Sequence, residues 1–128
     1  METKEKLTTI LLNYPLEIEN KVLNILKKKQ KIDDLKTSIQ KVKLRIDFDV
    51  LEDSQKEQWA KELSNDSKRK KEVISRLGRD ETYLSVEEAL ENEKEWEIPF
   101  LEAEISRMRR EFETAKVLLP FLVGGKND

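Results

Sequence analysis

The sequence predicts an all-α fold, a long, kinked, antiparallel helical hairpin of the coiled-coil type. The first observation is a column of five isoleucines spaced seven residues apart, at Ile18, Ile25, Ile32, Ile39 and Ile46. A strict seven-residue repeat keeps one column of side chains on one face of a helix. The second observation is composition: 41% of the 128 residues are charged, 6% are aromatic, and there are three glycines and three prolines. This composition favours long helices with hydrated outer faces over a sheet protein.

The first long helix is predicted over residues 15–51. Pro15 suits the first turn of a helix, where its missing N–H is not needed. From Val42 to Val50 apolar residues alternate with charged ones, which is the period of a strand. We nevertheless expect a helix there, because the seven-residue repeat runs through this part. Residues 1–14 carry enough leucine and isoleucine to form a separate short helix.

A short helical connector is predicted over residues 52–79. Asn65 or Asp66 is a typical N-cap, and Gly78 fits the position just after the end of a helix. The second long helix is predicted over residues 80–119, with Asp80 as its N-cap. Its apolar positions change phase at Pro99, where we expect a kink.

The second half of this helix has a regular apolar pattern that is expected to face the isoleucine column. Its residues are spaced three or four apart, at Ile98, Leu101, Ile105, Met108 and Phe112. Together the two sets form a predicted seam for packing and for association between copies. Pro120 is expected to end the helix, and residues 124–128 are expected to form a tail.

The charge distribution supports an antiparallel pairing of the two long helices. Residues 21–45 contain nine basic and two acidic residues, whereas residues 87–104 contain eight acidic residues and one basic residue. Opposite blocks on neighbouring helices attract and favour one orientation. A two-helix hairpin buries little surface, and residues such as Leu44, Phe48, Phe100 and Leu118 remain to be covered. We therefore expect self-association into a homo-oligomer.

The chain lacks the residues on which several classes of function usually depend. The chain has no cysteine and no histidine, so it lacks thiolate and imidazole metal ligands and the commonest general base. We expect no cofactor, no membrane span and a cytoplasmic location. The acidic residues Glu87, Glu88 and Glu91 lie within one helical turn, as in all-α nucleotide pyrophosphatases that bind magnesium. In so acidic a chain a hydrated helix face is the favoured interpretation.

Clustered basic residues are the candidates for contact with nucleic acid. Lys68, Arg69, Lys70 and Lys71 form one cluster beside a helix N-terminus, and Arg107 and Arg110 belong to another. Clustered Lys and Arg neutralise phosphates and make binding depend on salt. The competing interpretation is that these residues face water or pair with the acidic helix.

Three short motifs resemble those of a group of small helical proteins from phages and integrated mobile elements. They are Ser-Asn-Asp-Ser-Lys-Arg-Lys at 64–70, Asp-Glu-Thr-Tyr at 80–83, and Ile-Ser-Arg-Met-Arg-Arg-Glu-Phe at 105–112. The resemblance covers roughly residues 15–119. Such proteins are encoded among recombination and single-strand-binding genes. The resemblance implies an accessory role in DNA metabolism and carries over no catalytic residue.

The leading hypothesis is a non-enzymatic helical assembly or adaptor protein, accessory to a phage-type DNA recombination or replication module. Its partners would be copies of itself and a protein that the sequence does not identify. The alternative is a protein that binds nucleic acid directly through the basic clusters. A magnesium-dependent nucleotide pyrophosphatase is the second alternative.

Overall fold

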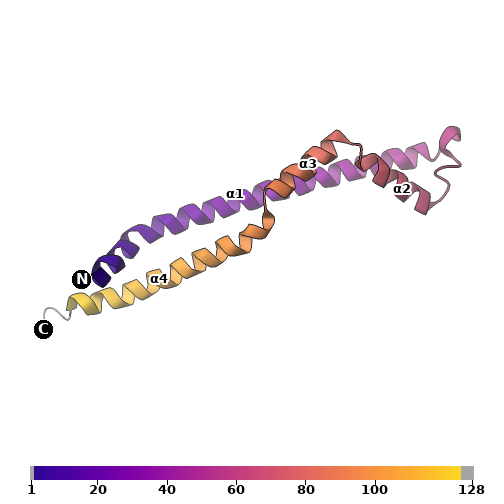
Figure 1. Cartoon of the computed structure of the whole chain (residues 1–128). Coiled ribbons are helices and arrows are strands. Elements are labelled where there is room, and N and C mark those ends of the chain that lie inside the picture. Colours follow the sequence, from indigo (N-terminus) through magenta and orange to yellow (C-terminus); the bar gives the residue numbers. More distant parts are fainter. Residues whose placement is uncertain (1, 125–128) are drawn as a thin grey trace. The chain divides into compact units, whose positions relative to one another are not determined.

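The computed structural model describes residues 2–124, and among them it contains helices and no strand (Figure 1). The elements are α1 (Glu2–Asp53), α2 (Asp66–Leu77), α3 (Glu81–Asn92) and α4 (Ile98–Gly124). Short 3₁₀ turns lie at Glu57–Trp59 and Glu95–Glu97. The predicted all-α helical fold is confirmed.

The chain divides into two compact units, and α1 contributes to both. In unit 1, which contains residues 2–29 and 96–124, the first half of α1 lies antiparallel to α4. The ion pairs follow this direction: Lys21 contacts Glu104 at 3.1 Å, and Lys28, further along α1, contacts Glu97 at 3.8 Å. The expected attraction between the basic and acidic blocks is therefore present.

One buried cluster of unit 1 lies near the start of α1 and the end of α4. Leu7, Ile10 and Ala115 form the buried cluster, and Tyr14 and Leu119 are among the residues that pack against it. Ala115 is completely buried, which leaves no room for a longer side chain where the two helices meet.

In unit 2, residues 30–95, the second half of α1 packs against α3 and α2. The buried cluster contains Val42, Ile46 and Val50 from α1 and Leu63 from the connector. Trp59, Val73, Leu77 and Tyr83 pack around it. The connector is therefore anchored to α1 by Leu63, which lies between the 3₁₀ turn and α2.

Capping side chains fix where α2 and α3 begin. The Asn65 side chain accepts a hydrogen bond from the backbone N–H of Lys68 at 2.9 Å, and Asp80 accepts one from Tyr83 at 2.8 Å. Each cap satisfies an N–H that has no partner inside its helix. Gly78 follows α2 as expected, but its φ of −64° is right-handed, so this position does not need glycine.

The predicted start of the first helix at residue 15 is wrong, because α1 begins at Glu2 and Pro15 lies inside it. Proline removes one backbone hydrogen bond from a helix and favours a bend. The residues on its N-terminal side stay helical, since Leu7 and Ile10 are held against α4. Figure 1 shows α1 bending in this N-terminal part, so the long helix is kinked.

The predicted single helix over 80–119 is also wrong. α3 ends at Asn92, Lys94 adopts a left-handed φ of 51°, and a 3₁₀ turn precedes α4. Pro99 is the second residue of α4, where a missing N–H has no cost, so it permits a new helix instead of kinking an old one.

The expected stop at Pro120 is wrong as well. α4 continues through this proline to Gly124. Gly124, predicted to open the tail, is therefore the last helical residue, and residues 125–128 lie outside the described part.

Candidate functional site

The isoleucine column is buried within the chain itself. Ile25, Ile32 and Ile46 are buried, Ile32 to 2% exposure, and Ile18 and Ile39 are half-buried. On α4, Ile98, Ile105 and Met108 are buried, and Leu101 and Phe112 are half-buried. The predicted seam residues therefore pack the hairpin together. Because they face each other within one chain, the buried ones are not free to form a surface for association between copies.

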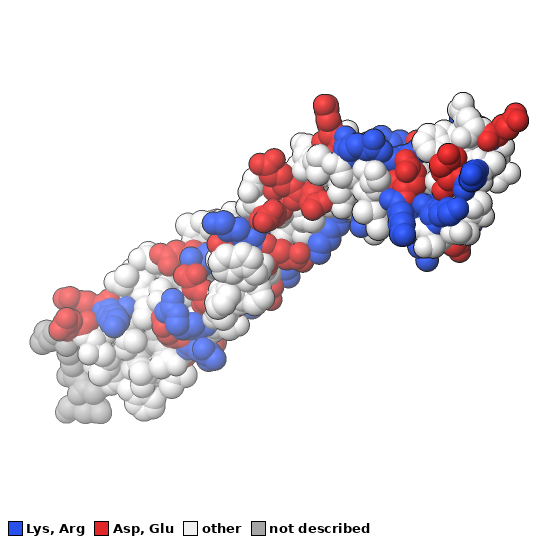
Figure 2. Space-filling model, turned by 45° about the vertical axis from the view of Figure 1, so that its right-hand side comes forward, with Lys and Arg blue, Asp and Glu red and all other residues white. Residues whose placement is uncertain are grey.

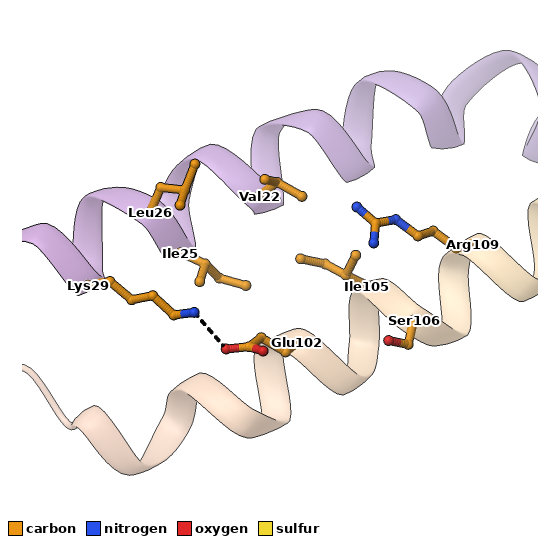
Figure 3. Close-up of a pocket in the computed structure, with 8 residues that line it drawn as sticks. All are labelled: Val22, Ile25, Leu26, Lys29, Glu102, Ile105, Ser106 and Arg109. Atoms are coloured by element: carbon orange, nitrogen blue, oxygen red, sulfur yellow. Dashed lines mark ion pairs between the residues drawn. The ribbon is translucent and has the colours of Figure 1, made fainter.

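A shallow groove marks the middle of the seam in unit 1. Figure 3 shows Ile25 of α1 and Ile105 of α4 pointing toward each other across it. The groove has a volume of about 220 Å³, and an ion pair of 3.1 Å between Lys29 and Glu102 lies on its rim. Arg109 extends from α4 toward α1 at its other side (Figure 3). These residues combine apolar packing with a charged rim, as expected for an interface between helices.

The first basic cluster lies on α2, and half of it serves the fold. The Lys68 ammonium donates to the Lys61 carbonyl at 3.2 Å. Arg69 donates to the Leu63 carbonyl at 3.2 Å and to Asp66 at 2.7 Å, and it lowers the pKa of that carboxyl group. Lys70 and Lys71 are exposed and make no ion pair with the described residues. Figure 2 shows basic and acidic side chains intermingled over this end of the molecule.

The second basic cluster belongs to a different unit. Arg107 donates to Glu111 at 2.7 Å, and the Tyr14 hydroxyl donates to the other oxygen of the same carboxylate at 2.6 Å. The Tyr14 bond first, and Arg107 second, lower the pKa of Glu111. The first basic cluster therefore lies in unit 2 and the second in unit 1.

A wide groove joins this cluster to the start of α1. Its volume is about 720 Å³, and Arg107 and Arg110 line it together with Lys6, Thr9 and Thr114. Within residues 2–124 neither Lys6 nor Arg110 has an ion pair, so this groove has an excess of positive charge. Sequence reasoning did not find Lys6, Thr9 or Thr114, because only the antiparallel pairing brings the two ends of the chain together.

The acidic group considered for magnesium lies on α3. The neighbouring Glu87 carboxylate raises the pKa of the Tyr83 phenol. In the described part of the chain, no group of three or more acidic side chains is arranged to hold a metal ion. Over the same residues, no helix is long and apolar enough to cross a membrane.

A set of large apolar residues is exposed on the surface. On α1 of unit 1 they include Leu16 and Leu23, and on α1 of unit 2 they include Leu44 and Leu51. Each pair has the same seven-residue spacing as the isoleucines, displaced by two positions. That displacement places the leucines on the side of α1 opposite the seam. The seven-residue spacing of these leucines is visible in the sequence and predicts a second apolar column on α1.

Unit 2 combines this outer face with a groove between α1 and α2, here called the α1–α2 groove. Its volume is about 420 Å³. Its lining is half apolar and half charged: Val50, Leu51, Val73 and Ile74 with Asp47, Asp66, Arg69 and Lys70. Two exposed residues, Leu44 and Phe48, extend the apolar stripe along α1 from Leu51.

Neither protein-family models, nor curated proteins, nor solved structures give a match to this chain. The described residues form an all-α helical fold with an exposed apolar stripe on α1 in unit 2. The resemblance to helical proteins of phages and mobile elements stays an expectation from sequence.

Proposed function

We propose that this protein is a non-enzymatic helical assembly or adaptor protein that acts by binding protein surfaces, first of all copies of itself. The observation that carries the proposal is the exposed apolar stripe that Leu44, Phe48 and Leu51 form on α1 in unit 2. Among residues 2–124, sixteen large apolar residues are exposed, in a chain in which 41% of the residues are charged. Contiguous exposed apolar surface marks protein interaction sites in soluble proteins.

The proportions of the hairpin give the physical reason. Two paired helices have a narrow core: within residues 2–124 twelve apolar side chains are buried, whereas sixteen large apolar side chains are exposed. Basic side chains of α1 form ion pairs with acidic side chains of the facing segments, as Lys21 does with Glu104 and Lys31 with Glu93. Burial of the outer leucines against another helix would add the apolar packing that one hairpin lacks.

Sedimentation velocity from low micromolar to near-millimolar concentration tests the proposal. We expect the weight-average mass to rise above the 15.1 kDa of one chain. The thermal midpoint should rise with concentration as well, because association stabilises the folded state by mass action. A mass of one chain and a constant midpoint across this range would contradict self-association.

Direct nucleic-acid binding is the second candidate, favoured by the wide groove that holds Lys6, Arg107 and Arg110. Grooves with excess Lys and Arg follow a phosphate backbone, and their affinity falls with salt. An accessory role in DNA metabolism, implied by the resemblance to phage proteins, agrees with this candidate.

Fluorescence anisotropy with labelled single- and double-stranded DNA, at low and physiological salt, tests the second candidate. Arg110→Ala should weaken binding and make the salt slope shallower by about one, because the variant neutralises one phosphate fewer. Lys116→Ala is the matched control, since it removes one positive charge from α4 at a residue that does not line the groove. Equal effects of the two variants, or binding at low salt only, would leave general charge attraction as the explanation.

A further inference from the structure

We infer that the α1–α2 groove receives a second copy of this chain in a contact with two-fold symmetry. This inference rests on the proposed function and names the surface and the partner. Two properties of unit 2 support it: the shape of the apolar surface around the groove, and the placement of two charges that have no ion pair in the described part of the chain.

The apolar surface consists of a ridge beside a hollow. Leu44, Phe48 and Leu51 lie four and three residues apart, so they share one side of α1. Phe48 is 63% exposed and Ile74, across the groove on α2, is 69% exposed. Both exposed fractions are high for large apolar side chains. A partner that covered this surface would release water from Leu44, Phe48, Leu51 and Ile74.

The groove is large enough for an aromatic side chain. Its volume is about 420 Å³, whereas an apolar cavity of roughly 150 Å³ accommodates benzene. The same unit therefore carries a projecting aromatic ring and a recess that admits one. In a two-fold contact each copy supplies the ridge to the groove of the other, as isologous interfaces require.

The charges select a copy of this chain over a purely acidic or basic partner helix. Asp66 and Arg69 pair with each other at 2.7 Å. The other two charged lining residues are Asp47 on α1 and Lys70 on α2, which have opposite signs. Neither makes an ion pair within 4.0 Å with residues 2–124, and Lys70 acts on Asp66 only as a longer-range charge. A two-fold rotation that places Asp47 of one copy against Lys70 of the other makes the reciprocal pair as well. The surface is thus complementary to itself.

Reversing the charge of Asp47 or Lys70 tests whether these two residues pair between copies. Asp47→Lys alone and Lys70→Asp alone should each weaken self-association roughly tenfold or more, because each places two like-charged pairs in the contact. The double variant should regain association. An equimolar mixture of the two single variants should associate more tightly than either alone, since both cross-contacts then join opposite charges. Phe48→Asp should weaken association in every background.

Two control variants make the same changes of charge in the same helices at residues that do not line the groove. They are Asp49→Lys on α1 and Lys71→Asp on α2. The substituted charged residues are all exposed, so far-ultraviolet circular dichroism should report the same helix content for each variant. Sedimentation velocity and mass photometry of the full chain provide the measurement.

Each result decides between the inference and the proposed function. Weakening by the single variants with recovery in the mixture, while the controls behave as wild type, would support the two-fold contact. Self-association that the groove variants do not alter would overturn the inference and leave the proposed function standing. Weakening without recovery in the mixture would also overturn the two-fold pairing. A wild-type chain that stays monomeric would overturn both.

Discussion

Leu63 offers the sharpest test of how the connector is held, because it is the largest side chain that is almost wholly buried and it lies outside any long helix. It is 2% exposed and packs against Val42, Ile46 and Val50 of α1. Leu63→Ala would remove the branched end of this side chain from the cluster and leave a cavity that the short connector only partly fills.

The loss of stability expected for Leu63→Ala follows from the burial of the leucine side chain. Transfer of a leucine side chain out of water contributes roughly 1.5–3 kcal/mol, and leucine-to-alanine changes at buried sites cost about 2–5 kcal/mol once the cavity is included. We expect the free energy of unfolding to fall by about 3 kcal/mol. For a chain of this size that corresponds to a midpoint lower by roughly 10 °C.

Urea denaturation followed by the fluorescence of Trp59 is the assay, because Trp59 packs against the same cluster. A Trp96→Phe background leaves Trp59 as the only indole, since the chain has two tryptophans. Leu12→Ala is the matched control, as Leu12 is 74% exposed and its loss should change stability by less than about 0.5 kcal/mol. A Leu63→Ala effect below about 1 kcal/mol, or no larger than that of the control, would refute the anchoring role.

Three further expectations concern the caps, the packing of the two helices and acid. Asn65→Ala should cost about 1 kcal/mol and speed hydrogen exchange at the Lys68 amide, which the Asn65 side chain holds at 2.9 Å; unchanged exchange would contradict the cap. Ala115→Leu should destabilise by about 1–3 kcal/mol in thermal melts, because Ala115 is fully buried between helices, and a rise in midpoint would count against close packing there. The lowered pKa of Glu111 contributes stability above its ordinary pKa that is lost as pH falls through its folded value. Tyr14→Phe should therefore raise the pKa of Glu111 in carboxyl NMR titrations, and an unmoved pKa would show that the 2.6 Å bond does not form in solution.

The helical parts of the fold were predictable where the signal is local. The seven-residue isoleucine column, the facing residues of α4 and the caps Asn65 and Asp80 depend on spacing or on a hydrogen bond three residues away. Sequence reasoning failed at Pro15 and Pro120, because it treated proline as a boundary. Both prolines lie within helices of the structure, and packing of α1 against α4 offsets the missing hydrogen bond.

The candidate surfaces were less accessible to sequence reasoning. The basic clusters were visible as runs of Lys and Arg, but only coordinates show that Arg69 holds the connector and that Arg110 shares a groove with Lys6. The α1–α2 groove joins residues 47–51 to residues 66–74, and no local pattern connects those segments. The spacing of the exposed leucines predicts a second apolar column on α1. Spacing alone does not show which of the two columns packs against the rest of the chain.

The sequence by itself determined that this chain is all-α, that two limbs pair in antiparallel orientation, and that isoleucine columns form the seam. These features follow from periodicity and from the sign of charge along the chain, which any helix of this sequence would have. Only the tertiary structure decided the break between α3 and α4 at Lys94, the insertion of Leu63 and the three grooves. Each of those depends on contacts between segments far apart in the chain, and the free energy of such contacts is absent from local propensity.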